Sequence, residues 1–192
     1  CYERVKEVFL EYLPDYDYEH LFIDNSSQDN TVGFLREIAA NDRNVKVIVN
    51  SRNFGMSRSP YHGILQTKGD AVVTIVADLQ TPPELIPAFV GKWQQGYKMV
   101  LGVRTGMEEG LFLRFVRNLY YKTMASISSV EQIGHFIGFG LFDKQIIQIM
   151  RALNDSAPYF RGLVSEIGFD KALIKYHQPP RSHGRSRHGY FH

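Results

Sequence analysis

Short runs of β-branched and aromatic residues alternate with longer amphipathic segments along most of this chain. Strands are expected where these runs occur, at residues 20–24, 45–49, 71–77, 98–103, 139–142 and 172–176. Helices are expected between them, at residues 1–13, 29–40, 58–67, 82–95, 110–127, 144–153 and 158–166. Strands separated by helices predict an α/β fold with one mostly parallel sheet flanked by helices.

The size and composition fit one globular domain. The chain has 192 residues, of which 44% are hydrophobic and 22% charged, so extensive disorder is not expected. A net charge of +2 is too small to indicate nucleic-acid binding. Cys1 is the single cysteine, which excludes an internal disulfide. Neither a signal peptide nor an apolar run of the ~20 residues needed to span a bilayer is visible.

Basic residues gather at the end of the sequence. After Asp170 there is no Asp or Glu, whereas lysines, arginines and histidines are frequent. This composition indicates either an anionic partner or a solvated basic terminus. The sequence begins within a helical pattern and stops in this basic stretch, so we expect it to be part of a longer protein.

Polar side chains follow the expected strand at residues 20–24. The loop DNSSQDNT runs from Asp24 to Thr31, immediately before a helix. Ligands in parallel sheets bind at the carboxyl ends of strands, and helix N-termini favour anions. The loop can therefore bind a base, ribose or phosphate, although capping of the helix by Ser27 or Asp29 would explain the same residues.

A second polar loop follows the most apolar strand. Asp78 and Gln80 alternate on what we expect to be an extended segment, so their side chains can point the same way. Two oxygen ligands, completed by a diphosphate and water, suit Mg²⁺ or Mn²⁺. The alternative is that Asp78 caps the helix beginning near Pro82.

Three motifs taken in order resemble the family 2 glycosyltransferases, which have the GT-A fold. They are IDNSSQDNT at residues 23–31, SRNFG at 51–55 and VADLQTPPE at 76–84. The later segments RGLVSEIGF and RSHGRSR resemble the branch of dolichyl- and undecaprenyl-phosphate sugar synthases. The resemblance covers nearly the whole chain.

The resemblance implies a role for each loop. Asp24 and Asn25, with Ser27 in the same loop, stand where the family contacts the nucleobase and ribose. The turn containing Asn53 and Gly55 is near the nucleotide in the family, although a tight turn that needs glycine explains it as well.

The resemblance also implies a metal site and a phosphate-binding loop. Asp78 stands at the last acid of the D-x-D metal motif, and Gln80 matches a second ligand of Mg²⁺ or Mn²⁺. Asp78 is also expected among the nucleotide-binding residues. Arg181, Ser186 and Arg187 match a loop that closes on the phosphates. Together, Asp78, Arg181 and Arg187 are the expected catalytic residues.

The chain departs from the family pattern in three places. Val76 replaces the first Asp of D-x-D, and Thr81 replaces an Asp often found after D-L-Q. Both changes predict weaker metal binding. The first strand of the family does not occur after Cys1. We therefore expect residues 1–176 to be a GT-A catalytic domain without that strand.

The resemblance implies transfer of a sugar from a UDP- or GDP-linked donor to a polyprenyl phosphate, with inversion at the anomeric carbon. An amphipathic helix at 111–124 and a basic juxtamembrane loop at 177–192 would place the enzyme on the cytoplasmic face of a membrane, with transmembrane helices beyond His192. The alternatives are a family 2 transferase acting on a soluble glycan or a protein, and a non-catalytic module that binds nucleotide-sugars. A homo-oligomer is compatible with all three.

Overall fold

The computed structural model describes residues 1–105 and 133–179 of this α/β protein. Its strands are β1 (His20–Asp24), β2 (Val45–Val49), β3 (Ala71–Thr74), β4 (Met99–Thr105), β5 (Phe136–Asp143) and β6 (Lys171–His177). Its helices are α1 (Tyr2–Tyr12), α2 (Thr31–Asn41), α3 (Gly55–Gln66), the 3₁₀ turn η1 (Pro83–Leu85), α4 (Ile86–Gln94), α6 (Lys144–Leu153) and α7 (Phe160–Glu166). The amphipathic segment 111–124 and the basic residues 180–192 lie outside the described residues.

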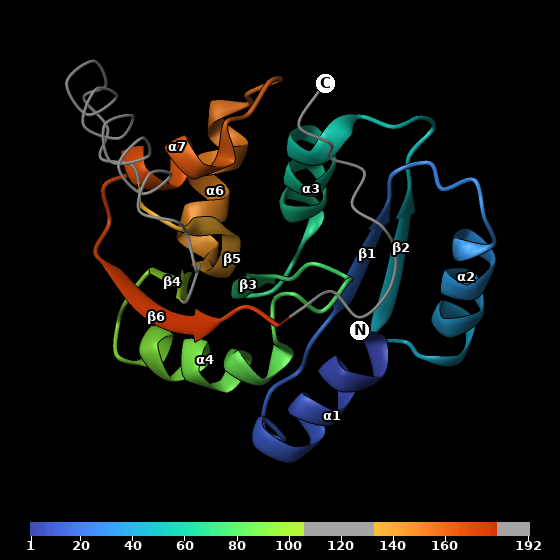
Figure 1. Ribbon diagram of the computed structural model, residues 1–192, viewed down its shortest axis with the longest axis horizontal. Coiled ribbons are helices and arrows are strands. Elements are labelled where there is room, and N and C mark those ends of the chain that lie inside the picture. The colour runs from blue at the N-terminus through green and yellow to red at the C-terminus, as the bar shows by residue number, and fades with distance from the viewer. Residues whose placement is uncertain (106–132, 180–192) are drawn as a thin grey trace, which may run out of the picture.

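The strands of the described residues form two sheets, whereas the sequence predicted one. β1 and β2 pair in parallel, with Asp24 opposite Val49. The second sheet has the order β3-β5-β4-β6, and β5 runs antiparallel to both of its neighbours. β1 has one edge that faces away from β2, and β3 has one edge that faces away from β5. In the described residues no strand pairs with either edge, so the two sheets remain separate (Figure 1).

The four-stranded sheet is buried on both faces because its side chains alternate between two helical layers. Met99, Leu101 and Phe142 pack toward α3, α6 and α7. Val100 and Leu141, one residue out of phase, pack toward α1 and α4. Figure 1 shows α4 and α6 on opposite sides of this sheet. The nearly continuous apolar sequence of β4 and β5 follows from this double burial.

Local sequence explains how several helices begin. Pro82 and Pro83 open the 3₁₀ turn that leads into α4, where proline is tolerated because first-turn N–H groups lack helical partners. Asp143 caps α6 by accepting a hydrogen bond of 2.9 Å from the backbone N–H of Gln145.

In the part of the chain that the structure describes, no helix is both long and apolar enough to cross a bilayer.

Candidate functional site

Asp24 ends β1 as one of the few buried charged residues. Its side chain is only 4% exposed, and Oδ2 accepts a 3.0 Å hydrogen bond from the backbone N–H of Ser27. Between them, Ser26 has a left-handed backbone with φ of 67°. Such a conformation is unfavourable for a residue other than glycine and often occurs at functional sites. The loop therefore turns sharply around a buried carboxylate.

Neither Ser27 nor Asp29 is the N-cap of the helix after this loop, although Asp29 bonds the first helical residue. Oδ1 of Asp29 accepts a 3.1 Å hydrogen bond from the backbone N–H of Thr31, the first residue of α2. The structure places Asn30 at the N-cap position, without a capping side-chain bond. Asp29 thus has a structural role at the helix start, and the Ser27 side chain is not the cap.

Asn25 joins this loop to the turn between β2 and α3. Its Nδ2 donates hydrogen bonds to Oδ1 of Asn53 at 2.8 Å and to the carbonyl of Gly55 at 3.3 Å. Its Oδ1 accepts from the backbone N–H of Phe54 at 2.9 Å and from Nδ2 of Asn50 at 3.2 Å. Five of the six residues expected to contact a nucleotide thus lie on two loops joined by hydrogen bonds: Asp24, Asn25, Ser27, Asn53 and Gly55. The sixth, Asp78, is on the loop after β3.

The second predicted loop has a different backbone from the one expected. β3 ends at Thr74 rather than at residue 77, and residues 77–80 form a turn instead of an extended segment. Leu79 is left-handed, with φ of 61°, and its N–H donates to the carbonyl of Val76 at 3.1 Å. The alternation argument for Asp78 and Gln80 was therefore wrong.

Asp78 supports this turn and does not cap the following helix. Its Oδ1 accepts a hydrogen bond of 3.1 Å from the backbone N–H of Gln80. The N-cap position before η1 is occupied by Pro82, and no side chain caps it. The helix-cap alternative for Asp78 was therefore wrong.

Thr81 is a residue whose role the sequence did not reveal. It is completely buried, and its hydroxyl accepts a 2.8 Å hydrogen bond from the backbone N–H of Val76. This bond uses the N–H that would otherwise extend β3, so it explains why the apolar run stops pairing early. The Val76 side chain is 45% exposed. Val76 and Thr81, the two departures from the D-x-D and D-L-Q patterns, thus flank the turn that carries Asp78.

The oxygen atoms near this turn fit a divalent cation only with further ligands. Within residues 1–105 and 133–179, no group of three or more His, Cys, Asp or Glu side chains could hold a metal ion. Asp78 and Gln80 offer a carboxylate and an amide oxygen, both of which suit Mg²⁺ or Mn²⁺. A diphosphate and water would have to complete the coordination.

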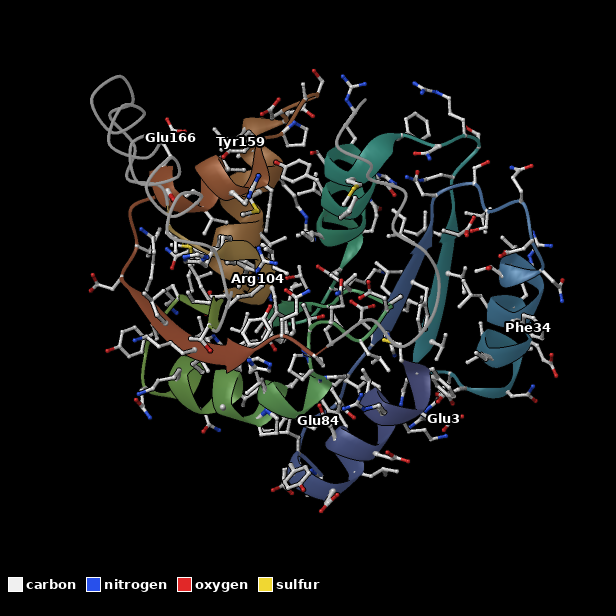
Figure 2. The ribbon with its side chains drawn as sticks, in the orientation of Figure 1. Glu3, Phe34, Glu84, Arg104, Tyr159 and Glu166 are labelled. Atoms are coloured by element: carbon white, nitrogen blue, oxygen red, sulfur yellow. The ribbon has the colours of Figure 1, made fainter. Side chains whose placement is uncertain are left out.

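The remaining predicted site residues come from other parts of the sequence. Asp78 and Gln80 lie on the turn that follows β3. Arg181, Ser186 and Arg187 lie outside the described residues. One basic side chain that the sequence did not single out is Arg104, near the end of β4 (Figure 2). Its Nη1 donates to Oε1 of Gln178 at 2.7 Å, and its buried Nε has no partner in the described part of the chain.

Comparisons with known proteins define the class to which this fold and these loops belong. The family model described as "Glycosyl transferase family 2" matches residues 1–167, which is most of the chain. The chain therefore belongs to glycosyl transferase family 2, as its motifs predicted.

Individual relatives match almost the entire chain. It is 34% identical over 188 residues to an uncharacterised glycosyltransferase, YkcC, of Bacillus subtilis (strain 168), covering 97% of this chain and 58% of the relative. It is 30% identical over 187 residues to the bactoprenol glucosyl transferase of Shigella phage SfX, covering 97% and 61%. An undecaprenyl-phosphate 4-deoxy-4-formamido-L-arabinose transferase of Pseudomonas fluorescens (strain SBW25) is 29% identical, covering 90% and 51%. The chain thus spans between half and about three fifths of these relatives.

A solved structure confirms the fold class. The mannosyltransferase PcManGT of Pyrobaculum calidifontis, solved in complex with GDP-Man and Mn²⁺, superposes with a TM-score of 0.53 at 16% sequence identity. The match covers 93% of this chain and 54% of that protein. The GT-A fold predicted from the sequence is therefore confirmed.

Proposed function

We propose that this chain is the catalytic domain of an inverting transferase that moves a sugar from a nucleotide-sugar to a polyprenyl phosphate at a membrane. The observation that carries the proposal is the match over 97% of the chain to a bactoprenol glucosyl transferase, within a family of glycosyltransferases. The match includes both polar loops that follow β1 and β3.

The nucleotide of a UDP- or GDP-linked donor would bind at the two loops joined by Asn25. Asp24 has a buried carboxylate that can accept hydrogen bonds from a base or ribose. Ser27, Asn53 and Gly55 lie on the same two loops and complete this nucleotide-binding group. The strained backbone at Ser26 supports this assignment, because such conformations persist where function requires them.

Asp78 and Gln80 are the proposed ligands of Mg²⁺ or Mn²⁺ bound together with the donor diphosphate. Such an ion, when bound, would act as a Lewis acid that stabilises the leaving nucleoside diphosphate. The backbone of the turn that carries these two residues is held by hydrogen bonds within the protein, from the N–H of Leu79 to the Val76 carbonyl and from the N–H of Val76 to the Thr81 hydroxyl. This preorganisation supports a role in catalysis.

The acceptor phosphate would attack the anomeric carbon from the face opposite the nucleotide. The bond to the diphosphate breaks as the new bond to the phosphate oxygen forms, so one displacement inverts the centre. The acceptor is already anionic, so no strong general base is required. Arg181 and Arg187 would stabilise phosphate charge through charge-assisted hydrogen bonds, with Ser186 as a further donor.

We also propose a membrane-associated enzyme on the cytoplasmic face. A polyprenyl phosphate is anchored in a bilayer, so the domain must reach the headgroup region. The amphipathic segment 111–124 and the basic segment 177–192 supply apolar and cationic residues for that contact.

A transfer assay with purified protein tests this proposal. UDP- and GDP-linked hexoses would be offered with undecaprenyl phosphate in detergent, with and without Mn²⁺, and lipid-linked sugar would be measured. We expect one donor to yield an inverted lipid-linked product that depends on the metal. Transfer to a soluble glycan but not to the lipid would contradict the proposed acceptor. Nucleotide binding without transfer to either acceptor would point to a binding module.

A further inference from the structure

The Asn25 side chain has no hydrogen-bonding capacity left for a ligand. A primary amide offers two N–H donors and an oxygen with two lone pairs. Nδ2 of Asn25 uses both donors, toward Asn53 and Gly55, and Oδ1 accepts from Phe54 and Asn50. The amide orientation is fixed by two partners, because a backbone N–H can only donate and a backbone carbonyl can only accept.

Asn53 is oriented by this arrangement. Its Oδ1 accepts from Nδ2 of Asn25 and from the backbone N–H of Gly55, both at 2.8 Å. Its Nδ2 makes no hydrogen bond within the described part of the chain and is on an exposed residue. The two hydrogen bonds to Oδ1 fix the orientation of the Asn53 amide, and they therefore also fix the direction in which Nδ2 can donate.

We infer that Asn25 is a positioning residue that acts through Asn53 and the turn at residues 50–55, and that Asn53 Nδ2 contacts the nucleotide. This inference rests on the proposed function and assigns separate tasks to two asparagines in the same binding loops. Asn25 holds the loop after β1 against the turn after β2, and Asn53 donates a hydrogen bond to an acceptor atom of the nucleotide.

A double-mutant cycle distinguishes a positioning residue from a second ligand. Binding of UDP and of GDP would be measured by calorimetry for the parent, Asn25→Ala, Asn53→Ala and the double variant. We expect each single variant to weaken nucleotide binding about tenfold, the size expected for one or two lost hydrogen bonds. The double variant should have the same affinity as the single variant that binds the nucleotide less tightly. Asn41→Ala is the matched control, because within residues 1–105 and 133–179 this amide bonds only the Glu37 carbonyl of its own helix. Multiplicative losses, or parent-like binding by Asn25→Ala, would overturn the inference.

A conservative variant adds a readout that simple destabilisation would not produce. Asn25→Asp places a carboxylate oxygen against two acceptors, Oδ1 of Asn53 and the Gly55 carbonyl. Protonation restores a donor, so nucleotide binding relative to the parent should recover as the pH falls from about 7.5 to about 5. A relative affinity that stays constant or falls over this range contradicts the inference.

Hydrogen exchange without nucleotide separates failure of the inference from failure of the proposed function. The Phe54 amide loses its acceptor in Asn25→Ala and should exchange faster than in the parent and in Asn41→Ala. Unchanged exchange would show that Asn25 does not hold the turn, whatever the nucleotide affinities. If the parent binds neither UDP nor GDP, the proposed donor site fails, and with it the contact assigned to Asn53 Nδ2.

Discussion

The indole Nε1 of Trp93 donates a 2.7 Å hydrogen bond to Oδ2 of Asp143, which ties helix α4 to the start of helix α6. The same oxygen accepts from Nζ of Lys98 at 3.0 Å, while Oδ1 caps α6. Burial raises the pKa of Asp143, but the hydrogen bonds from Trp93, Gln145 and Lys98 outweigh it and leave the pKa below its ordinary value.

We expect Asp143→Ala to lower the free energy of unfolding by about 2 kcal/mol, since it removes a helix cap and leaves the Trp93 donor unpaired. Chemical denaturation at neutral pH measures this change. Asp70→Ala is the matched control, because Asp70 pairs with Lys144 on the surface and is 79% exposed. Its removal should cost under about 0.5 kcal/mol. Similar losses in both variants would contradict the structural role of Asp143.

Because the His20 side chain is largely buried, we expect the folded protein to lose stability in mild acid. Burial lowers the pKa of His20 to about 4. The unfolded chain therefore takes up this proton at higher pH than the folded protein, and stability falls as the pH drops from about 6.5 toward 4. His20→Phe keeps the aromatic stacking on Phe22 and should flatten this part of the pH profile. An unchanged profile would exclude His20 as its source.

Asp78→Asn should abolish the increase in nucleoside diphosphate affinity produced by Mn²⁺, with little effect on folding, because an isosteric amide replaces a carboxylate ligand. Calorimetry with and without the ion measures this difference. Glu84→Gln is a matched control on the adjacent η1 turn, where the carboxylate pairs with Arg4. A variant at Asp78 that retains the full effect of Mn²⁺ would remove this residue from the metal site.

Val76→Asp should strengthen metal-dependent nucleotide binding, in contrast to Asp78→Asn. The Val76 side chain is 45% exposed, so a carboxylate there would remain hydrated and could add a third oxygen ligand. We expect tighter binding of Mn²⁺ with nucleoside diphosphate than in the parent. Weaker binding would show that this position points away from the ion.

Arg181→Ala should lower turnover in detergent by about 10- to 100-fold if the side chain bonds a phosphate in the transition state. Arg185→Ala is a matched control, since Arg185 carries the same charge but occupies a position of the segment RSHGRSR to which the resemblance assigns no role. Equal effects of both variants on vesicle binding, with normal turnover in detergent, would instead identify the basic segment as an electrostatic anchor.

The sequence predicted those parts of the fold that depend on local pattern. β1 and β2 have the expected bounds because their apolar runs are bordered by polar residues on both sides. β3 was predicted too long, since residues 75–77 continue the apolar pattern while Thr81, five residues from Val76, captures its backbone N–H. The antiparallel direction of β5 depends on long-range pairing with β3 and β4, which periodicity does not encode.

In the candidate site, too, the sequence revealed the features that depend on local pattern and missed those that depend on long-range contacts. Asp24 and Asp78 were predicted as site residues because each stands at the end of an apolar run. The structure places Asp24 at the end of β1, whereas Asp78 lies beyond the end of β3 at Thr74. The bonds between Asn25 and Asn53 connect residues 28 positions apart, so no local pattern could reveal that one amide is saturated by the other loop.

The separation of the two sheets affects how the protein opens. In the described residues no ladder of backbone hydrogen bonds joins β1 to β3, so the β1–β2 pair is held mainly by side-chain packing from helices such as α3, where Gly63 lies against Ile23. Packing without a shared ladder allows one part to open while the other stays folded. The loops that we propose to bind the nucleotide emerge from the smaller pair, whereas Asp78 follows the larger sheet. A partial unfolding step that releases β1 and β2 would therefore disrupt the proposed donor loops while leaving the turn at Asp78 folded.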